Sequence, residues 1–173
     1  MKKNGYIDSG IKSIRLMREA EPKMFWKYCT FVIIHGLSWT IQVVATQLFF
    51  DTAQSFYDGR VKIGFLIFTL LCMIGAYALT QVMNGVDNCF ANIYFLAIHK
   101  YSNLEIFKKI DELNCAQFES TKKLDMINKA VSGSNSTAWV GFTLIDVFLF
   151  YTTYFLSMSI YPVSYTHLTL PTN

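Results

Sequence analysis

Two long stretches of the chain contain no charged side chain, and each is long enough to cross a lipid bilayer. Residues 28–50 and residues 63–86 lack Asp, Glu, Lys and Arg. A membrane-spanning helix needs about 20 apolar residues to cross about 30 Å of hydrocarbon. A third stretch, residues 137–161, is equally apolar but contains one acid, Asp146. The pattern predicts an all-α membrane protein with three long transmembrane helices.

Residues 87–136, between the second and third spans, have the pattern of a helical excursion into water. Ile106, Ile110 and Leu113 recur at helical spacing with charged residues between them, and the pattern resumes farther along the chain. This spacing is typical of amphipathic helices. We expect a cytoplasmic helical hairpin, in which a long helix leaves the membrane, a turn follows at residues 115–123, and a second helix returns.

The segment before the first span, residues 1–23, is predicted to be cytoplasmic. Residues 11–20 alternate isoleucine and leucine with basic side chains, as a helix lying on a membrane surface does. Pro22 suits the first turn of the helix that follows. Between the first two spans, residues 51–62 are expected to form a loop, with a turn at Asp58-Gly59.

The charge distribution predicts how the chain is oriented. Only 16% of the residues are charged, against about 25% in soluble domains, which weakens any interpretation as a soluble enzyme. Residues 1–27 contain seven Lys and Arg, residues 51–62 two, and residues 87–136 six. The positive-inside rule therefore favours a multi-pass protein of the cell membrane with a cytoplasmic N-terminus. Basic flanks of this kind account for the net charge of +3 without a nucleic-acid partner.

Candidate catalytic and metal-binding residues are scarce in the sequence. The four cysteines form no CxxC pair, and none of the three histidines lies near a second kind of ligand in the sequence. We expect no metal site, no catalytic residue and no cofactor on this chain. An integral-membrane enzyme is the least favoured function class, because the sequence shows no nucleophile motif and no cluster of acids with histidine.

Polar residues follow one side of each of the first two spans. Polar groups within a bilayer face the bundle interior or a water-filled cavity. The stripes therefore either line a translocation path or form hydrogen bonds between helices, each worth about 0.6 kcal/mol. The first stripe contains His35, Ser38, Gln42 and Thr46, and the second contains Thr69, Thr80, Asn84 and Asp87, with Tyr77 at its edge.

Asp146 is the one acid inside a predicted span. An ionisable residue within a span is by default a functional candidate. If the returning helix stays in water for its first turns, however, Asp146 lies at the inner interface, where its charge costs little. We favour the interface position.

The order of these elements resembles the first half of the six-helix membrane domain of ABC exporters. The resemblance covers roughly residues 10–161 and centres on the segment IFKKIDELNCAQFESTKKLDMINKAVSGSNS. Phe118-Glu119 match the aromatic-acid pair usual at the family's first cytoplasmic turn. Leu124, Ile127 and Ala130 match its returning helix. The family's common Gly and Arg after this turn are absent, with Lys123 and Asn128 near those places, as in a divergent subgroup.

The resemblance implies a function and a set of partners. The turn would be a coupling helix that contacts nucleotide-binding domains, joined in cis or in trans, in a dimer of half-transporters embedded in membrane lipid. ATP and Mg²⁺ would bind those domains, since this sequence contains no GxxxxGK[ST] loop. The coupling residues implied are Cys115, Gln117, Phe118, Glu119, Thr121 and Lys122. The expected translocation path comprises His35, Ser38, Gln42, Thr46, Tyr77, Thr80 and Asn84.

The resemblance also implies that the chain is a fragment, with residues 24–161 forming part of the transmembrane domain. Residues 163–173, VSYTHLTLPTN, leave the hydrophobic pattern and resemble translated sequencing-adapter read-through, so we expect a non-native tail. A natural polar tail is the alternative. The alternative function is a small autonomous membrane protein whose cytoplasmic hairpin binds a soluble partner.

Overall fold

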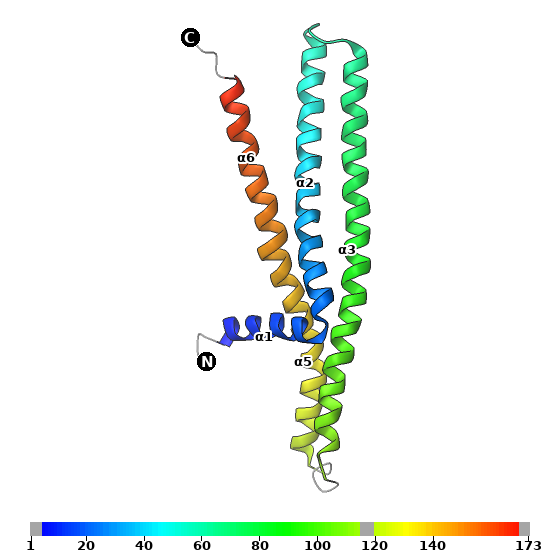
Figure 1. The fold of residues 1–173 in the computed structure, drawn as a ribbon, viewed down its shortest axis with the longest axis vertical. Coiled ribbons are helices and arrows are strands. Elements are labelled where there is room, and N and C mark those ends of the chain that lie inside the picture. Colours follow the sequence, from blue (N-terminus) through cyan, green and yellow to red (C-terminus); the bar gives the residue numbers. More distant parts are fainter. Residues whose placement is uncertain (1–4, 115–119, 170–173) are drawn as a thin grey trace. The chain divides into compact units, whose positions relative to one another are not determined.

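The computed structural model describes residues 5–114 and 120–169, the segment 161–169 by its backbone alone, and these parts are helical. Figure 1 shows the order of the elements. They are α1 (Gly5–Ala20), α2 (Pro22–Tyr57), α3 (Ile63–Asp111), α5 (Thr121–Ile145), the π-helical η1 (Asp146–Tyr151) and α6 (Thr152–Thr169). Three stretches are long and apolar enough to span a membrane, Pro22–Tyr57, Ile63–Asp111 and Thr121–Ile160. The prediction of helices in all three apolar stretches, each long and apolar enough to span a membrane, is confirmed.

The chain divides into two compact units, and α2 and α3 each run from one into the other. The first unit contains Met1–Cys29 and Cys89–Asp146, and the second contains Thr30–Asn88 and Val147–Asn173. In the first unit the described elements are α1, the start of α2, the C-terminal half of α3, and α5. In the second they are the hairpin formed by the rest of α2 and α3, together with the π-helix and α6.

Aromatic side chains form the core of the first unit. Tyr28 on α2, Tyr94 on α3 and Phe142 on α5 are buried, with ring centroids 5.2 to 6.0 Å apart. The hydroxyl of Tyr94 donates a 2.7 Å hydrogen bond to the carbonyl of Met17 at the end of α1. This bond satisfies the polar end of a buried tyrosine and ties α1 to α3.

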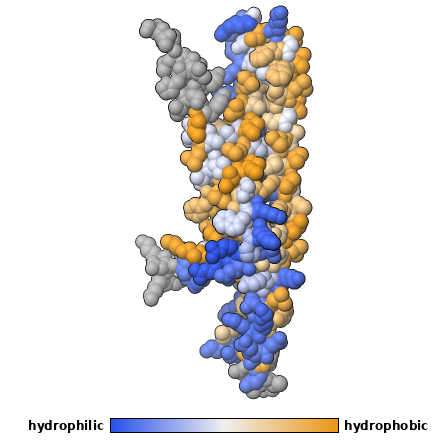
Figure 2. Space-filling model, viewed as in Figure 1, coloured by the Kyte–Doolittle hydropathy of each residue, from blue (hydrophilic) through white to orange (hydrophobic). Residues whose placement is uncertain are grey.

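The helices α3 and α5 run antiparallel with a regular register in the first unit. Tyr94 packs against Phe142, and nearer the hairpin tip Ile110 and Met126 line one groove. As the residue numbers rise along α3, those of the neighbouring residues on α5 fall by the same amount. The same register places Ser102 opposite Ser134, and both buried hydroxyls lack a hydrogen-bond partner among the described residues. Figure 2 shows hydrophilic residues covering much of this hairpin.

α1 lies across α5 (Figure 1), and the buried residues Ser13 and Met17 belong to α1. A Cβ atom added to Gly141 would collide with the sulfur of Met17, and one added to Gly10 would come within 3.0 Å of Leu144 Cδ1. The predicted helix at residues 11–20 is confirmed and begins earlier, at Gly5. α2 then begins at Pro22, as the sequence predicted.

A tight turn joins α2 and α3 in the second unit. Gly59 has a φ of +73°, a left-handed conformation that glycine adopts without steric cost. The amide of Arg60 donates to the carbonyl of Ser55, and its guanidinium pairs with Asp58. The expected loop at residues 51–62 is therefore wrong in its first part, because helix α2 continues through Tyr57.

The third apolar stretch is helical but changes its winding. Residues 146–151 form a π-helical turn between α5 and α6. Such turns inside α-helices are rare and occur frequently at functional sites. The backbone of α6 then continues to Thr169, through most of the segment predicted to be a non-native tail.

Candidate functional site

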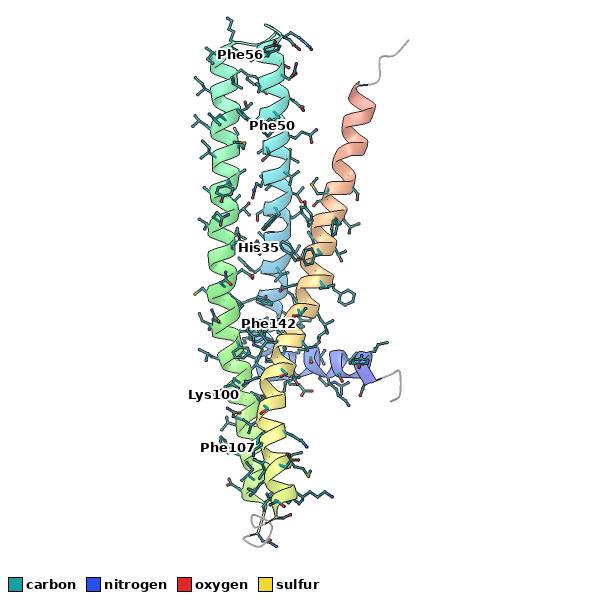
Figure 3. All side chains as sticks on the ribbon, turned by 180° about the vertical axis from the view of Figure 1, so that it is seen from behind. His35, Phe50, Phe56, Lys100, Phe107 and Phe142 are labelled. Atoms are coloured by element: carbon teal, nitrogen blue, oxygen red, sulfur yellow. The ribbon has the colours of Figure 1, made fainter. Side chains whose placement is uncertain are left out.

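His35 is the most connected residue of the first polar stripe, and it lies in the second unit (Figure 3). Its side chain is buried. Nε2 lies 2.8 Å from Oδ1 of Asn84 on α3 and 3.3 Å from the indole nitrogen of Trp39. Nδ1 lies 4.0 Å from a carboxylate oxygen of Asp87. The ring also packs against Phe150 of the π-helix, with centroids 5.0 Å apart.

The contacts of Nε2 restrict the tautomer of the imidazole. A nitrogen that accepts the Trp39 N–H cannot also donate to an amide oxygen. In a neutral imidazole Nε2 has either one lone pair or one proton, so it accepts from Trp39 or donates to Oδ1 of Asn84, but not both. When it accepts from Trp39, the ring proton is on Nδ1, which lies 4.0 Å from the Asp87 carboxylate.

Two further contacts join helices in the second unit, and the first of them involves residues of the predicted stripes. Thr80 on α3 donates a 3.3 Å hydrogen bond to the carbonyl of Ser38 on α2, as well as one to its own helix at Ala76. Thr40 on α2 and Ser157 on α6 lie 2.6 Å apart through their hydroxyl oxygens. The stripe therefore contains hydrogen bonds between helices, as one of the two interpretations of the sequence predicted.

Other residues of the predicted path do not bridge helices in this way. Thr46 donates to the backbone carbonyl of Gln42 in its own helix, and the side-chain oxygen Oε1 of Gln42 is buried without a partner among the described residues. Thr69 is fully buried and donates to Leu66 of its own helix. Tyr77 is 55% exposed on the surface of α3. The structure thus brings together His35, Ser38, Thr80 and Asn84 and leaves Tyr77 outside the group.

Asp146 lies at the start of the π-helix, within the first unit. The Tyr28 hydroxyl donates a 3.4 Å hydrogen bond to its carboxylate. The sequence analysis did not identify Tyr28 and Tyr94 as buried residues with hydrogen bonds to other helices. Phe90, Tyr94 and Ile98 nevertheless follow one another at four-residue spacing. That spacing is the signal that could have identified the buried face of α3.

Most of the predicted coupling turn lies outside the described residues, namely Cys115, Gln117, Phe118 and Glu119. The predicted turn is too long at its end, because α5 already begins at Thr121. Thr121 and Lys122 are exposed in the first turn of that helix. The backbone amide of Lys123 donates a 2.9 Å hydrogen bond to the carbonyl of Ser120 at the start of this helix.

An apolar groove of about 270 Å³ lies between the two helices of the hairpin tip. Its walls are formed by isoleucine, leucine, methionine and alanine side chains, with the lysines Lys109 and Lys123 among them. Outside the groove, Lys108 pairs with Glu105 at 2.7 Å, and this hydrogen bond raises the pKa of Lys108 above its ordinary value. Lys129 pairs with Asp125 at 2.6 Å.

Among the described residues, no group of three or more His, Cys, Asp or Glu side chains is arranged to hold a metal ion. No protein-family profile, curated protein or solved structure matches this chain.

Proposed function

We propose that the chain is the N-terminal half of the membrane domain of an ATP-driven ABC exporter. One observation carries the proposal. At about 1.5 Å per residue, the 49 residues of α3 extend for about 74 Å, whereas the hydrocarbon core is about 30 Å thick. The helix therefore continues far beyond its charge-free run, and α5 leads back into a third apolar stretch.

This architecture suits transmission of motion from a soluble domain to a membrane bundle. The hairpin formed by the C-terminal half of α3 and by α5 has an exposed, charged surface and an apolar groove near its tip. A nucleotide-binding domain that contacts this tip, fused or separate, would move both helices together. ATP and Mg²⁺ belong to that domain in the proposal, because the 173 residues contain no GxxxxGK[ST] loop.

The proposal gives the polar residues of the second unit a role in the bundle. His35, Ser38, Thr80 and Asn84 join α2 to α3 in one half of a domain whose other half would supply further helices. In the dimer of half-transporters that we propose, the remaining polar side chains Gln42 and Thr46 face the substrate path. The N-terminus is cytoplasmic in this arrangement, as the distribution of Lys and Arg favours.

Replacement of Phe118 by Ala tests the proposed coupling in the complete transporter. We expect ATP hydrolysis to continue while transport per ATP falls several-fold, because coupling between sites is typically worth about 1–3 kcal/mol. Transport of a labelled substrate into inverted vesicles and release of phosphate are measured together. Phe107→Ala is the matched control, since Phe107 is exposed on the same hairpin but outside the predicted turn (Figure 3).

Normal coupling in the Phe118→Ala protein would contradict the assigned turn. The alternative function, an autonomous membrane protein that binds a soluble partner through the same hairpin, is favoured by the groove between α3 and α5. Sequencing of the source DNA beyond codon 173 distinguishes the two. Three more apolar spans followed by a Walker A loop support the exporter, and a stop codon supports the autonomous protein.

A further inference from the structure

A shallow pocket of about 360 Å³ lies between α1 and the start of α2, within the first unit. Two arginines and four apolar side chains line it, and no acid is among them. The lining residues are Ile11, Ile14, Arg15, Arg18, Phe25 and Trp26. A cavity that combines guanidinium groups with apolar walls suits a ligand with an anionic end and a hydrocarbon body.

Two of the four apolar side chains that line this pocket, Ile11 and Trp26, are exposed, whereas Phe25 is buried. Ser13 and Met17 form the buried face of α1, which packs on α5. At 100° per residue, Ile7 and Ile11 lie on a flank of the helix away from that face, and they are 72% and 55% exposed. Trp26, in the first turn of α2, is 64% exposed. In Figure 2, hydrophobic and hydrophilic surfaces adjoin along α1.

The two arginines are available to a ligand. Among the described residues, neither Arg15 nor Arg18 takes part in an ion pair, whereas Lys12 on the same helix pairs with Asp8 at 2.6 Å. Guanidinium groups bind phosphate through parallel N–H donors. The charge of the pocket is therefore complementary to a phosphodiester.

The position of α1 places this pocket at the edge of the hydrocarbon. α1 crosses α5 at Gly10, which meets Leu144, and at Met17, which meets Gly141. Both residues of α5 lie near the beginning of the third apolar stretch, and Phe25 and Trp26 lie just before the first. A helix that crosses a spanning helix at this level lies in the membrane interface.

We propose that this pocket binds an anionic phospholipid. The phosphate lies between Arg15 and Arg18, and an acyl chain follows Ile11 and Trp26 toward the hydrocarbon. Clusters of basic residues on amphipathic helices recognise anionic lipids in this way. The proposal depends on membrane insertion of the chain and is independent of exporter function.

Lipid binding by the full-length chain in detergent micelles tests the proposal. Phosphatidylglycerol and phosphatidylcholine with identical acyl chains are titrated, and bound lipid is counted by native mass spectrometry. We expect the wild-type chain to bind phosphatidylglycerol about tenfold more tightly. The double variant Arg15→Gln/Arg18→Gln should lose this preference, whereas the matched control Lys12→Gln should keep it. Circular dichroism verifies that α1 remains helical in each protein.

Two further measurements separate the parts of the pocket. Ile11→Asn should weaken binding of both lipids and keep their ratio, because it removes apolar contact and leaves both arginines. Inorganic phosphate at millimolar concentration should fail to displace the bound lipid. Equal binding of the two lipids by the wild-type chain overturns the proposal without any variant. The proposal is also overturned if Lys12→Gln loses the preference for phosphatidylglycerol as fully as the double arginine variant does. Displacement by phosphate alone would indicate a free-anion site instead.

Discussion

His35 shows what a single polar residue does inside this helical bundle. Its imidazole contacts Asn84 across the hairpin and Trp39 along its own helix, and it packs against Phe150 with the two rings tilted. A polar group in hydrocarbon without a partner costs several kcal/mol. The hydrogen bond between His35 and Asn84 therefore stabilises the contact between α2 and α3, mainly because neither side chain has water available as an alternative partner.

A double-mutant cycle measures the strength of this contact. His35→Phe, Asn84→Leu and the double variant are unfolded with sodium dodecyl sulfate in mixed micelles. We expect a coupling energy of about 0.6 kcal/mol, and at most about 1.7 kcal/mol, as for other hydrogen bonds between membrane helices. Thr46→Ala combined with Asn84→Leu should show no coupling, because Thr46 donates only within its own helix. Zero coupling for His35 and Asn84 would argue against a structural hydrogen bond.

At the scale of elements, the spans follow directly from the sequence and their ends do not. Charge-free runs mark where lipid contacts a helix, but a helix continues wherever its backbone bonds and packing allow. α2, for example, extends past Asp51 to Tyr57, and Thr52 within this extension is buried. The membrane edge and the helix end are different boundaries, and hydropathy reports only the first.

The contacts of the candidate site were predictable only in part. Helical spacing grouped His35 with Ser38 on one stripe and Thr80 with Asn84 on another, because polar residues within a span face protein or a cavity rather than lipid. The structure brings these four residues together. Which residues pair depends on the register between helices, which one chain's periodicity does not contain. For the same reason the aromatic cluster of Tyr28, Tyr94 and Phe142 was missed.

Gly36 determines how closely α2 approaches the π-helix. A Cβ atom at this position would lie 2.9 Å from the carbonyl oxygen of Phe150 and 3.3 Å from Thr153 Cβ. One turn farther along, Thr40 meets Ser157. Small residues at this four-residue spacing let membrane helices pack closely.

Gly36→Leu should therefore destabilise the second unit by about 1–3 kcal/mol, the usual cost of overpacking. The measurement is the midpoint of unfolding in sodium dodecyl sulfate, followed by circular dichroism. Gly75→Leu is the matched control, because nothing lies within 4 Å of a Cβ at that glycine in α3. If both substitutions shift the midpoint equally, the close approach of Gly36 to Phe150 contributes nothing.

At the scale of the whole molecule, the proposed orientation in the membrane rests on a difference in the number of basic residues between loops. The proposal of a cytoplasmic N-terminus places the turn at Gly59 outside the cell and the α3–α5 hairpin inside. Arg60 and Lys129 provide suitable probes, since their side chains are 71% and 74% exposed. Because the two side chains are similarly exposed, a difference in labelling between cysteines at these positions reports the side of the membrane on which each lies.

Arg60→Cys, in a variant without the native cysteines, should react with a membrane-impermeant maleimide in intact cells. Lys129→Cys should react only after the membrane is permeabilised. Gel-shift analysis of the labelled protein measures both. The reverse pattern would invert the proposed topology, because the positive-inside rule would then fail for this chain.

The facing serines of the first unit divide the seam between α3 and α5 into two layers. Tyr94, Ile98 and Phe142 are packed on one side of Ser102 and Ser134, and the groove residues lie on the other. The two buried hydroxyls weaken the seam, since each loses hydration and neither has a hydrogen-bond partner among the described residues. Local opening follows such weak points. We therefore expect α3 and α5 to separate locally near the tip of the hairpin and to admit water there, while the aromatic residues Tyr94 and Phe142 remain packed.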